Sequence, residues 1–289
     1  MSNVILVTGG AGFIGSHLCE RLSQDPNNII FSLDDYSTGS KENHVKKVNY
    51  IKGHTKDIEK LIDFEVNTVF HLGEYSRVEQ SFEDLDSVWT ANKIGTFSVL
   101  KFCKENSCRL IYAGSSTKFG DNGNGKNQSP YGWTKASNTE LIQNFDNWFG
   151  INYAIVYFYN AYGPREIRTG KYSTIIAKFS EQMRKGEQLT VVSPGTQERN
   201  FTHVSDIVSG LILVAKSGKG DNYGIGHAKS YNIIQIAEMF GGKIKMLPER
   251  KGNRMSAQVH TKKIIDLGWK PNNDIEDYIE LLKKNNWDV

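Results

Sequence analysis

The sequence predicts an α/β fold, a Rossmann-type doubly wound parallel sheet with a smaller interleaved C-terminal lobe. Two observations lead to this prediction. Over the first 160 residues, short apolar runs alternate with segments of helical period, as in a parallel sheet covered by helices on both faces. The first apolar run ends in a glycine-rich turn at residues 8–15 (TGGAGFIG), and a helix pattern comes directly after it.

The elements are predicted from the alternation of apolar runs and turn residues. We expect strands at 3–8, 29–33, 48–51, 67–72, 109–114 and 152–158, and helices near 13–24, 56–61, 81–106 and 131–149. Further on, the pattern favours helices at 172–186, 204–216, 232–240 and from 275, with a short strand at 189–192. A first domain is therefore expected over 1–165, with 200–225 returning to it, and a smaller lobe over 166–289.

Composition excludes several classes of function. The 289 residues are 38% hydrophobic and 23% charged, and the net charge of +3 comes without a long basic run, so no nucleic-acid partner is expected. Cys19, Cys103 and Cys108 form no C-x-x-C pair, which favours a reduced setting, with Cys19 and Cys103 on helices. The sequence shows no signal peptide and no stretch long enough to cross a bilayer. We therefore expect a cytoplasmic protein without a membrane partner.

The glycine-rich turn indicates a dinucleotide site. Gly9, Gly12 and Gly15 lie three residues apart, so that the chain turns tightly, a pyrophosphate approaches the backbone and the helix packs on its strand. The helix N-terminus offers free N–H groups to the phosphates. Asp34 ends the second apolar run, where a carboxylate accepts hydrogen bonds from an adenosine ribose and repels a 2′-phosphate. These residues favour NAD over NADP. The alternative is a glycine-rich turn of another α/β protein.

Ser115, Tyr131 and Lys135 are the candidate catalytic residues. Tyr131 and Lys135 are four residues apart, which puts them on one face of a helix. A phenol with a pKa of about 10 is a poor base, and a neighbouring ammonium and a positive nicotinamide favour the phenolate. Ser115 ends a buried strand and can hold a substrate alcohol while Tyr131 takes its proton. The alternative for the Tyr–Lys pair is an ordinary surface pair. No metal site is expected.

The chain resembles the extended short-chain dehydrogenases/reductases of the NAD-dependent nucleotide-sugar epimerase/dehydratase family over nearly its whole length. The resemblance rests on a set of short motifs along the chain. They are TGGAGFIG (8–15), DDYSTG (34–39), VFHL (69–72), NKIGT (92–96), YGWTK (131–135), YNAYGPR (159–165), RNFTHVSD (199–206) and LGWKP (267–271).

The resemblance implies roles for individual residues. A nucleotide-diphosphate sugar would be the substrate, held by the smaller lobe, and arginine forks suit its diphosphate. Each arginine alone would be interpreted as a surface charge. The implied cofactor residues are Gly9, Gly12, Phe13, Ile14, Asp34, Leu72, Gly73, Ser76, Asn92, Tyr131, Lys135 and Tyr159. The implied substrate residues are Ser115, Ser116, Asn160, Arg199 and Arg250.

Two positions depart from the family pattern. Gly53 is followed by His54 where relatives often carry an Asp that meets the adenine, so the adenine contact is expected to be rearranged. After His71-Leu72 relatives usually have two small residues, whereas this chain has Gly73-Glu74. Glu74 either points away to solvent or a partner, which the rarity of buried unpaired charges favours, or brings a carboxylate near the site and alters the handling of cofactor or substrate.

The two residues directly after Ser115 narrow the reaction type. Dehydratases of the family carry Asp-Glu there, whereas this chain has Ser116-Thr117, whose hydroxyls are inadequate for the elimination, so a 4,6-dehydratase is disfavoured. Oxidation at C4 of the sugar remains, by a 4-epimerase or a 4-dehydrogenase, or by a keto-sugar reductase in reverse. Segments 71–77 and 112–120 are similar to GDP-manno-heptose 4-dehydrogenases of capsule polysaccharide synthesis. Alternatives are a non-catalytic NAD-sensing protein and a dehydrogenase of small free alcohols.

The resemblance also implies a homodimer. Helices around 81–104 and 131–149 would pair across a two-fold axis into a four-helix bundle. The candidate seam residues, each of which could equally belong to the intramolecular core, are Phe97, Leu100, Leu141, Phe145 and Trp148.

Overall fold

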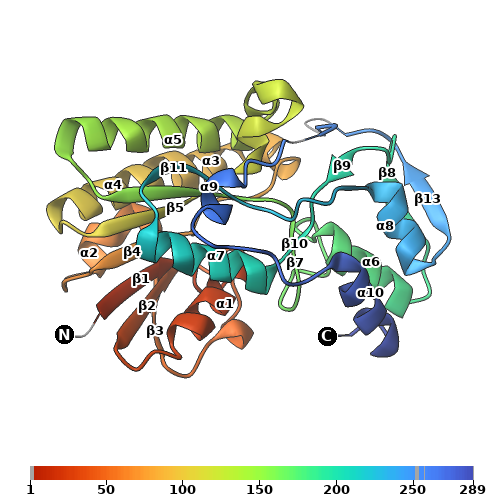
Figure 1. Ribbon diagram of the computed structural model, residues 1–289, viewed down its shortest axis with the longest axis horizontal. Helices are drawn as coiled ribbons and strands as arrows, with labels where there is room; N and C mark the ends of the chain where they lie inside the picture. Colours follow the sequence, from red (N-terminus) through yellow and green to blue (C-terminus); the bar gives the residue numbers. More distant parts are fainter. Residues whose placement is uncertain (1–2, 251–253, 257, 289) are drawn as a thin grey trace.

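A seven-stranded parallel sheet forms the centre of the molecule in the computed structural model, which describes residues 3–250, 254–256 and 258–288 (Figure 1). The strand order is β11-β6-β5-β4-β1-β2-β3, so the order reverses between β1 and β4. The strands are β1 (Asn3–Thr8), β2 (Asn28–Asp34), β3 (Val48–Lys52), β4 (Thr68–His71), β5 (Arg109–Ser115), β6 (Tyr153–Phe158) and β11 (Gly220–Ile225). This doubly wound order confirms the predicted fold class and puts the ligand side at the carboxyl ends of the strands.

Six of these strands were predicted from the sequence, and β11 was not. Its sequence, GDNYGI, is polar over its first half and shows no apolar run. The strand lies at the sheet edge beside β6, and the pairing shifts register between Gly220 and Tyr223. Edge strands need fewer apolar residues because one side faces no neighbouring strand, so the hydrophobic signal is weak.

Helices cover both faces of the sheet, as Figure 1 shows. Helices α1 (Phe13–Leu22) and α7 (Val204–Ser217) lie on one face, where their apolar residues share a core with β1 and β6. On the other face, α2 (Ile58–Leu61), α4 (Thr96–Glu105) and α5 (Pro130–Phe149) bury a second core against β4 and β5. Each face thus has its own helical layer.

The helix predicted over 81–106 is interrupted. It consists of α3 (Leu85–Val88), a π-helical segment at Trp89–Gly95 and α4. Gly95 allows close approach here, because a Cβ on it would lie 2.3 Å from Thr55 Oγ1. The wider turn carries Asn92, which is fully buried. Such π segments often accompany functional sites.

The smaller lobe has its own core and lies beside the carboxyl ends of the sheet (Figure 1). Its main elements are α6 (Ile175–Arg184), β8 (Leu189–Val192), α8 (Ile233–Phe240), β13 (Ile244–Leu247) and α10 (Ile275–Lys284). The two-residue strands β7 (Ala161–Tyr162), β9 (Glu198–Arg199), β10 (Thr202–His203) and β12 (Tyr231–Asn232) form small pairs between the main elements.

The chain returns from the smaller lobe to the sheet twice. The first return is α7 with β11. The second is α9 (Lys262–Ile265), whose Ile264 joins the core beneath α7 together with Trp269. Trp269 Nε1 donates to the carbonyl of Asp206 at 3.0 Å. The two parts of the chain are therefore interleaved beyond residue 226.

Several aromatic side chains stay exposed on the face formed by the π-helical segment, α4 and α5. Trp89 and Trp133 stack with ring centroids 6.1 Å apart, and Phe97 and Trp148 are 46% and 61% exposed. Two of the five candidate seam residues are wrong, because Leu100 and Phe145 are buried in the core under α4 and α5. A helix pattern alone does not tell which apolar side faces the sheet.

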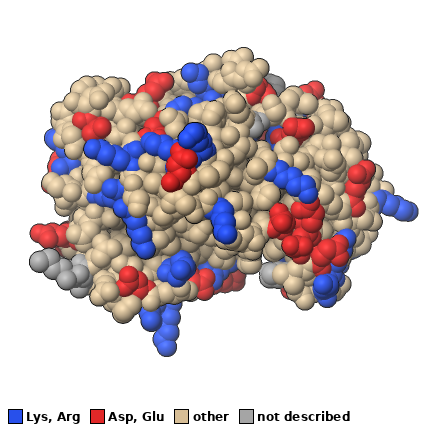
Figure 2. All heavy atoms as spheres, in the orientation of Figure 1, with Lys and Arg blue, Asp and Glu red and all other residues tan. Residues whose placement is uncertain are grey.

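The remaining surface and the cysteines fit the composition. Figure 2 shows lysine and arginine side chains scattered over one face of the larger lobe and interleaved with neutral atoms. Cys19, Cys103 and Cys108 are free and buried, and the first two lie on α1 and α4 as predicted. Within the described residues, none of the helices has the length and apolar character needed to cross a membrane.

Candidate active site

The turn between β1 and α1 has the geometry of a phosphate cradle. A Cβ on Gly15 would lie 2.1 Å from the carbonyl oxygen of Gly9, so only glycine fits there. Gly9 has a φ of +74°, and its Cβ would lie 2.9 Å from Gly73 in the loop after β4. Helix α1 has no side-chain cap and no acidic residue in its first turn, which leaves its N–H groups open to an anion.

Asp34 ends β2 beside this turn. Its two carboxylate oxygens accept hydrogen bonds from the backbone N–H groups of Ala11 and Tyr36, both at 2.8 Å. Burial nevertheless raises the pKa of Asp34. A carboxylate oxygen has more than one acceptor site, so an anchored carboxylate can still take a ribose hydroxyl. These features fit the adenosine and pyrophosphate of a dinucleotide.

His54 occupies the position where an Asp was expected by resemblance. Its Nδ1 accepts the backbone N–H of Lys56 at 3.1 Å and so caps the short 3₁₀ turn at Thr55–Asp57. Burial lowers the pKa of His54, which favours the neutral ring. The departure in sequence therefore has a local structural role.

Ser115 and Ser116 lie where β5 ends. Ser115 Oγ donates to Thr117 Oγ1 at 3.0 Å and accepts the backbone N–H of Thr117 at 3.2 Å. Ser116 Oγ accepts a hydrogen bond from Arg254 Nη2 at 3.3 Å. Each of these serine hydroxyls thus has a partner that fixes its rotamer.

Tyr131 and Lys135 lie on the first turns of α5. Ser129 caps the helix by accepting the N–H of Gly132 at 3.0 Å, and Pro130 opens it. Tyr131 is partly exposed, whereas Lys135 is only 6% exposed and donates to the carbonyl of Ala113. The phenol of Tyr131 is therefore accessible from solvent, whereas the ammonium of Lys135, one helical turn further on, is buried.

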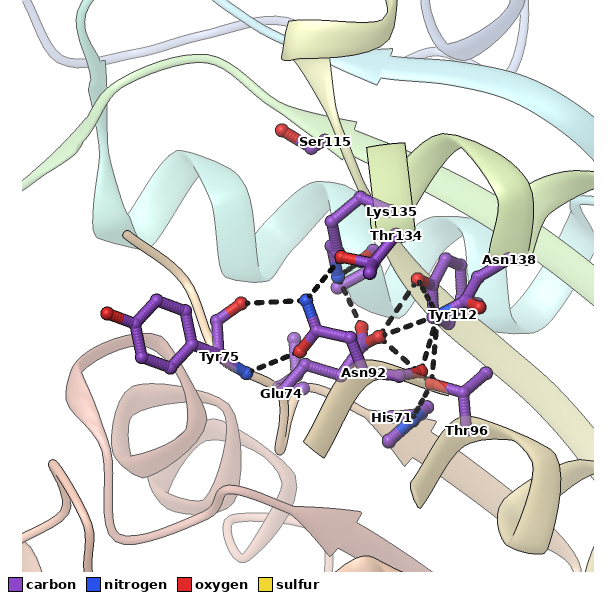
Figure 3. A network of polar contacts seen from close by, with 12 residues as sticks. His71, Glu74, Tyr75, Asn92, Thr96, Tyr112, Ser115, Thr134, Lys135 and Asn138 are labelled. Carbon is purple, nitrogen blue, oxygen red and sulfur yellow. Dashed lines mark hydrogen bonds and ion pairs between the residues drawn. The ribbon is translucent and has the colours of Figure 1, made fainter. Parts of the chain in front are cut away.

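Glu74 points into the protein, so the interpretation in which it faces solvent is wrong. Its side chain is only 2% exposed and forms an ion pair with Lys135. Its other oxygen accepts from Thr96 Oγ1 at 2.9 Å, Asn138 Nδ2 at 3.0 Å and the Tyr112 hydroxyl at 3.1 Å. Figure 3 shows the carboxylate at the centre of these contacts. The rarity of buried charges misled the prediction, because here the partner is itself a buried site residue.

The buried side chain of Asn92 binds the backbone of the loop that follows β4. Its Oδ1 accepts the N–H of Tyr75 at 2.7 Å, and its Nδ2 donates to the carbonyl of Tyr75 and to Thr134 Oγ1, at 3.3 and 3.0 Å (Figure 3). With its polar atoms turned inward, Asn92 holds the segment from Leu72 to Ser76 against α5. A direct contact of Asn92 with the cofactor stays a prediction.

Tyr159 and Asn160 come directly after β6. They were expected near the nicotinamide and the diphosphate, respectively. Tyr159 is fully buried, donates to the carbonyl of Gln258 at 3.0 Å and accepts the N–H of His260 at 3.1 Å. Asn160 has a φ of +34° and donates to the carbonyl of Asn200 at 3.1 Å. The backbone after β6 is thereby fixed to the segments at 200 and 258–260.

Arg199 and Arg254 lie together, and Arg254 reaches the Ser116 hydroxyl. Arg199 Nη2 donates to the carbonyl of Arg254 at 2.8 Å. Burial, together with the charge of Arg254, lowers the pKa of Arg199 to about 9. Arg254 is 9% exposed, and it acts electrostatically on both Tyr131 and Tyr159. Two guanidinium groups this close together suit an anionic ligand.

Arg250, the arginine predicted for this loop, lies elsewhere. Its Nη1 is 2.5 Å from Glu79 Oε2, and both side chains are more than one third exposed. The structure therefore brings Arg254, which was not predicted from the sequence, to the Ser116 hydroxyl, and it pairs Arg250 with a surface carboxylate. The run Glu249 to Arg254 holds two arginines and a lysine, and spacing alone does not select one of them.

Arg77 was also overlooked. Its Nε and Nη2 donate to the carbonyl of Tyr172 at 2.9 and 2.7 Å, and its charge acts on Tyr131. Arg77 thereby ties the loop after β4 to the segment that enters the smaller lobe. The only signal in the sequence was its place in the stretch after His71.

A nucleotide-binding sheet with a serine at the end of β5 and a Tyr–Lys pair on α5 defines an extended short-chain dehydrogenase/reductase. The sequence pattern of the NAD dependent epimerase/dehydratase family matches residues 5–226, and the chain belongs to that family. The family depends on NAD, and the glycine turn and Asp34 fit this cofactor.

Similar proteins include both epimerases and decarboxylases. UDP-glucuronic acid decarboxylase 6 of Arabidopsis thaliana is 30% identical over 311 residues, which cover 97% of this chain and 88% of that protein. A putative UDP-glucose 4-epimerase of Methanocaldococcus jannaschii is 29% identical over 306 residues, 98% of this chain and 99% of its own length. The crystal structure of the Thermotoga maritima UDP-glucose 4-epimerase with UDP-glucose superposes with a TM-score of 0.88 at 25% identity, covering 98% and 99% of the two chains.

Proposed function

We propose that the protein oxidises C4 of a nucleotide-diphosphate hexose or heptose with NAD, as a 4-epimerase or a 4-dehydrogenase. The observation that carries this proposal is the arrangement on α5, with Tyr131 partly exposed and the buried Lys135 one turn below it. A phenol needs a nearby cation to act as a base near neutral pH. The keto-sugar reductase is the same chemistry in reverse.

Each residue has a defined part in this reaction. Ser115 holds the C4 hydroxyl, and Tyr131 removes its proton. Lys135 binds the nicotinamide ribose and favours the phenolate. When bound, NAD supplies the acceptor for the hydride that leaves C4. Gly9, Gly12, Phe13 and Ile14 hold the pyrophosphate, and Asp34 holds the adenosine ribose.

The substrate is proposed to be held by its diphosphate. Arg199 and Asn160 are the proposed diphosphate ligands, and Ser116 lies beside the sugar. The relatives act on or bind UDP-linked sugars, which supports a nucleotide-diphosphate sugar in general. The likeness of segments 71–77 and 112–120 to GDP-manno-heptose 4-dehydrogenases puts a GDP-linked substrate level with a UDP-linked one, and a dehydrogenase level with an epimerase. A 4,6-dehydratase stays disfavoured, because Ser116 and Thr117 come after the catalytic serine and neither is a carboxylic acid.

A homodimer is proposed through the exposed aromatic face of the π-helical segment, α4 and α5. Large exposed apolar patches on soluble proteins mark interfaces. The large apolar side chains of this face include Trp89, Phe97, Trp133, Trp148 and Phe149, each at least 46% exposed. A second copy pairing its α4 and α5 with these helices would cover them.

The decisive experiment tracks the absorbance of the purified protein with a panel of UDP-, GDP- and dTDP-sugars and heptoses, with chromatography of the products. A stereoisomer formed without a lasting NADH band indicates an epimerase. An NADH band that grows and persists, or that needs an added oxidant to turn over, indicates a 4-dehydrogenase. If no sugar gives a product or an NADH band while NAD is bound, the result supports the NAD-sensing alternative. Turnover undiminished in Tyr131→Phe would refute the assigned base.

A further inference from the structure

Glu74 is a buried carboxylate that contacts Lys135, the residue whose positive charge the proposed reaction uses. Its side chain is less exposed than that of its partner Lys135, 2% against 7%. It accepts hydrogen bonds from Thr96, Tyr112 and Asn138 in addition to the ammonium, so its two oxygens are well supplied with donors. The carboxylate and the ammonium lie in contact, so each compensates the charge of the other.

The polar chain behind Glu74 is oriented toward the carboxylate. Thr8 Oγ1 accepts the N–H groups of Leu72 and Gly73, so its hydroxyl donates to His71 Nδ1 at 2.8 Å. His71 Nε2 then donates to Thr96 Oγ1 at 3.0 Å, and Thr96 donates to Glu74. Burial lowers the pKa of His71 to about 4, which keeps the ring neutral. Within this chain of contacts, Glu74 is the end that bears the charge.

Other charged and titratable groups around the pair do not replace this interaction. Lys93 lies on the π-helical segment, but its ammonium donates to Ser137 Oγ and Asn138 Oδ1 and not to Glu74. The Tyr112 hydroxyl donates a hydrogen bond to Glu74. Burial raises the pKa of Tyr112, so the phenol stays neutral. The charges of Arg77 and Arg254 act on the phenol of Tyr131, and neither arginine is a partner of Glu74.

We propose that Glu74 is a positioning residue that fixes the Lys135 ammonium beneath the nicotinamide ribose and neutralises its charge, so that the site holds NAD⁺ more favourably relative to NADH. The inference rests on the proposed function, which places Lys135 at the nicotinamide. The oxidised nicotinamide ring carries a positive charge that the reduced ring lacks. A lysine without a counter-ion repels the oxidised ring, whereas a neutral ion pair does not.

The same ion pair governs Tyr131. The electrostatic help that the phenolate receives from Lys135 is weakened when a carboxylate lies against the ammonium. With Glu74 in place, Lys135 therefore stabilises a phenolate on Tyr131 less than an unpaired lysine would. The site is thereby set toward the oxidised cofactor.

The first test titrates the cofactor-free protein with NAD⁺ and with NADH by calorimetry. In Glu74→Gln, which keeps the shape and removes the charge, we expect the ratio Kd(NAD⁺)/Kd(NADH) to rise by about threefold or more. Glu74→Asp keeps the charge and is expected to stay closer to the wild-type ratio. A Glu74→Gln protein that is folded but keeps the wild-type ratio, including one in which both affinities fall together, would overturn the proposal.

Asp221→Asn is the matched control. Asp221 is also a shielded carboxylate, 10% exposed, with a lysine and a tyrosine as partners, Lys118 at 3.4 Å and the Tyr157 hydroxyl at 2.7 Å. It lies on β11, and its partners Lys118, Tyr157 and Gln143 do not include Lys135. Its variant is expected to lose stability and to leave the ratio unchanged. A comparable change of the ratio in Asp221→Asn would show that loss of any buried carboxylate has this effect, and would also overturn the proposal.

A variant of Lys135, the partner of Glu74, is expected to change the ratio of the two dissociation constants in the opposite direction. This test does not depend on whether Glu74→Gln is folded. Lys135→Met leaves the Glu74 carboxylate uncompensated, so the ratio Kd(NAD⁺)/Kd(NADH) is expected to fall below the wild-type value. A rise would contradict the charge argument. Because these are binding measurements, they stand even if no nucleotide sugar is turned over, which would refute the proposed function.

A kinetic readout separates charge from shape. In the direction of sugar oxidation, the ascending limb of the pH profile of kcat/KM is expected to move to lower pH in Glu74→Gln. A purely structural role would lower kcat/KM at all pH values without moving the limb, and this outcome would count against the proposal.

Discussion

Arg254 Nη2 lies 3.3 Å from Ser116 Oγ, which links a loop of the smaller lobe directly to the end of β5. The carbonyl of Arg254 accepts Arg199 Nη2, so one residue connects both a serine and a second arginine. Arg254 Nη1 is buried and makes no hydrogen bond to any described residue. A buried guanidinium nitrogen without a partner is costly, and a substrate oxygen can satisfy it.

Arg254→Met is therefore expected to impair use of the nucleotide sugar. A hydrogen bond to a charged group contributes about 1.5–3 kcal/mol, so kcat/KM should fall by about 10- to 100-fold. Steady-state kinetics with the substrate found in the sugar panel measures this loss. Arg250→Met is the comparison, and its surface pair with Glu79 predicts a much smaller effect. A larger loss in Arg250→Met would restore Arg250 as the phosphate ligand.

Gly15→Ala is expected to damage the nucleotide site severely. The added methyl group would lie 2.1 Å from the Gly9 carbonyl oxygen, so the turn must open. We expect NAD affinity to fall by about tenfold or more and the unfolding temperature to drop by several degrees. Gly12→Ala is the control for the unfolding temperature, since its nearest atom lies 3.2 Å away. An equal drop of the unfolding temperature in the two variants would contradict this account of the turn.

Glu166 is expected to make stability fall as the pH rises. Burial raises its pKa to about 7 from the usual 4.5, although it accepts hydrogen bonds from the Gly163 N–H and Thr174 Oγ1. Below pH 4.5 both states hold the proton. Between 4.5 and 7 the unfolded state releases it while the folded state keeps it, so the folded state loses stability over this window, and the cost is complete above pH 7.

The Glu166→Gln variant removes this titration. Urea unfolding at pH 5 and pH 8 should show the variant gaining about 1–3 kcal/mol relative to wild type as the pH increases. The comparison between the two pH values corrects for any constant packing cost of the substitution. If the two proteins change in parallel, Glu166 does not hold a raised pKa.

Trp148→Glu is expected to convert a dimer into a monomer. Trp148 is 61% exposed on α5, within the proposed interface, and a charge there cannot be buried against a second copy. Size-exclusion chromatography with light scattering measures the change. Met246→Glu on β13 alters another exposed apolar residue, 46% exposed, on the smaller lobe, and should leave the dimer intact. A monomeric wild type would refute the interface.

The parts of the fold that were predicted correctly depend on local rules. The glycine turn, its helix and the carboxylate at Asp34 result from short-range backbone requirements, and the Tyr131–Lys135 pair results from the helical repeat. The strands buried on both faces gave unbroken apolar runs. β11 and the π-helical segment were missed because edge pairing and the approach of Gly95 to Thr55 are tertiary effects.

The parts of the site that were missed depend on long-range contacts. Whether Glu74 points inward depends on Lys135 and Thr96, which lie on other elements. Arg254 reaches Ser116 from a position 138 residues further along the chain, and no local pattern distinguishes it from Arg250. Side-chain direction in loops is set by partners that a linear pattern does not identify.

The order in which the strands and helices of the sheet are synthesised affects the folding of the nascent chain. Strand β6 is made well before its neighbour β11, and α7 and α9 come after the first segments of the smaller lobe. A nascent chain that has released only residues 1–165 therefore carries an open strand edge and an uncovered apolar face, both of which are prone to aggregation. We expect such a fragment to require chaperones, and the two lobes to be unsuitable for exchange as separate modules between relatives.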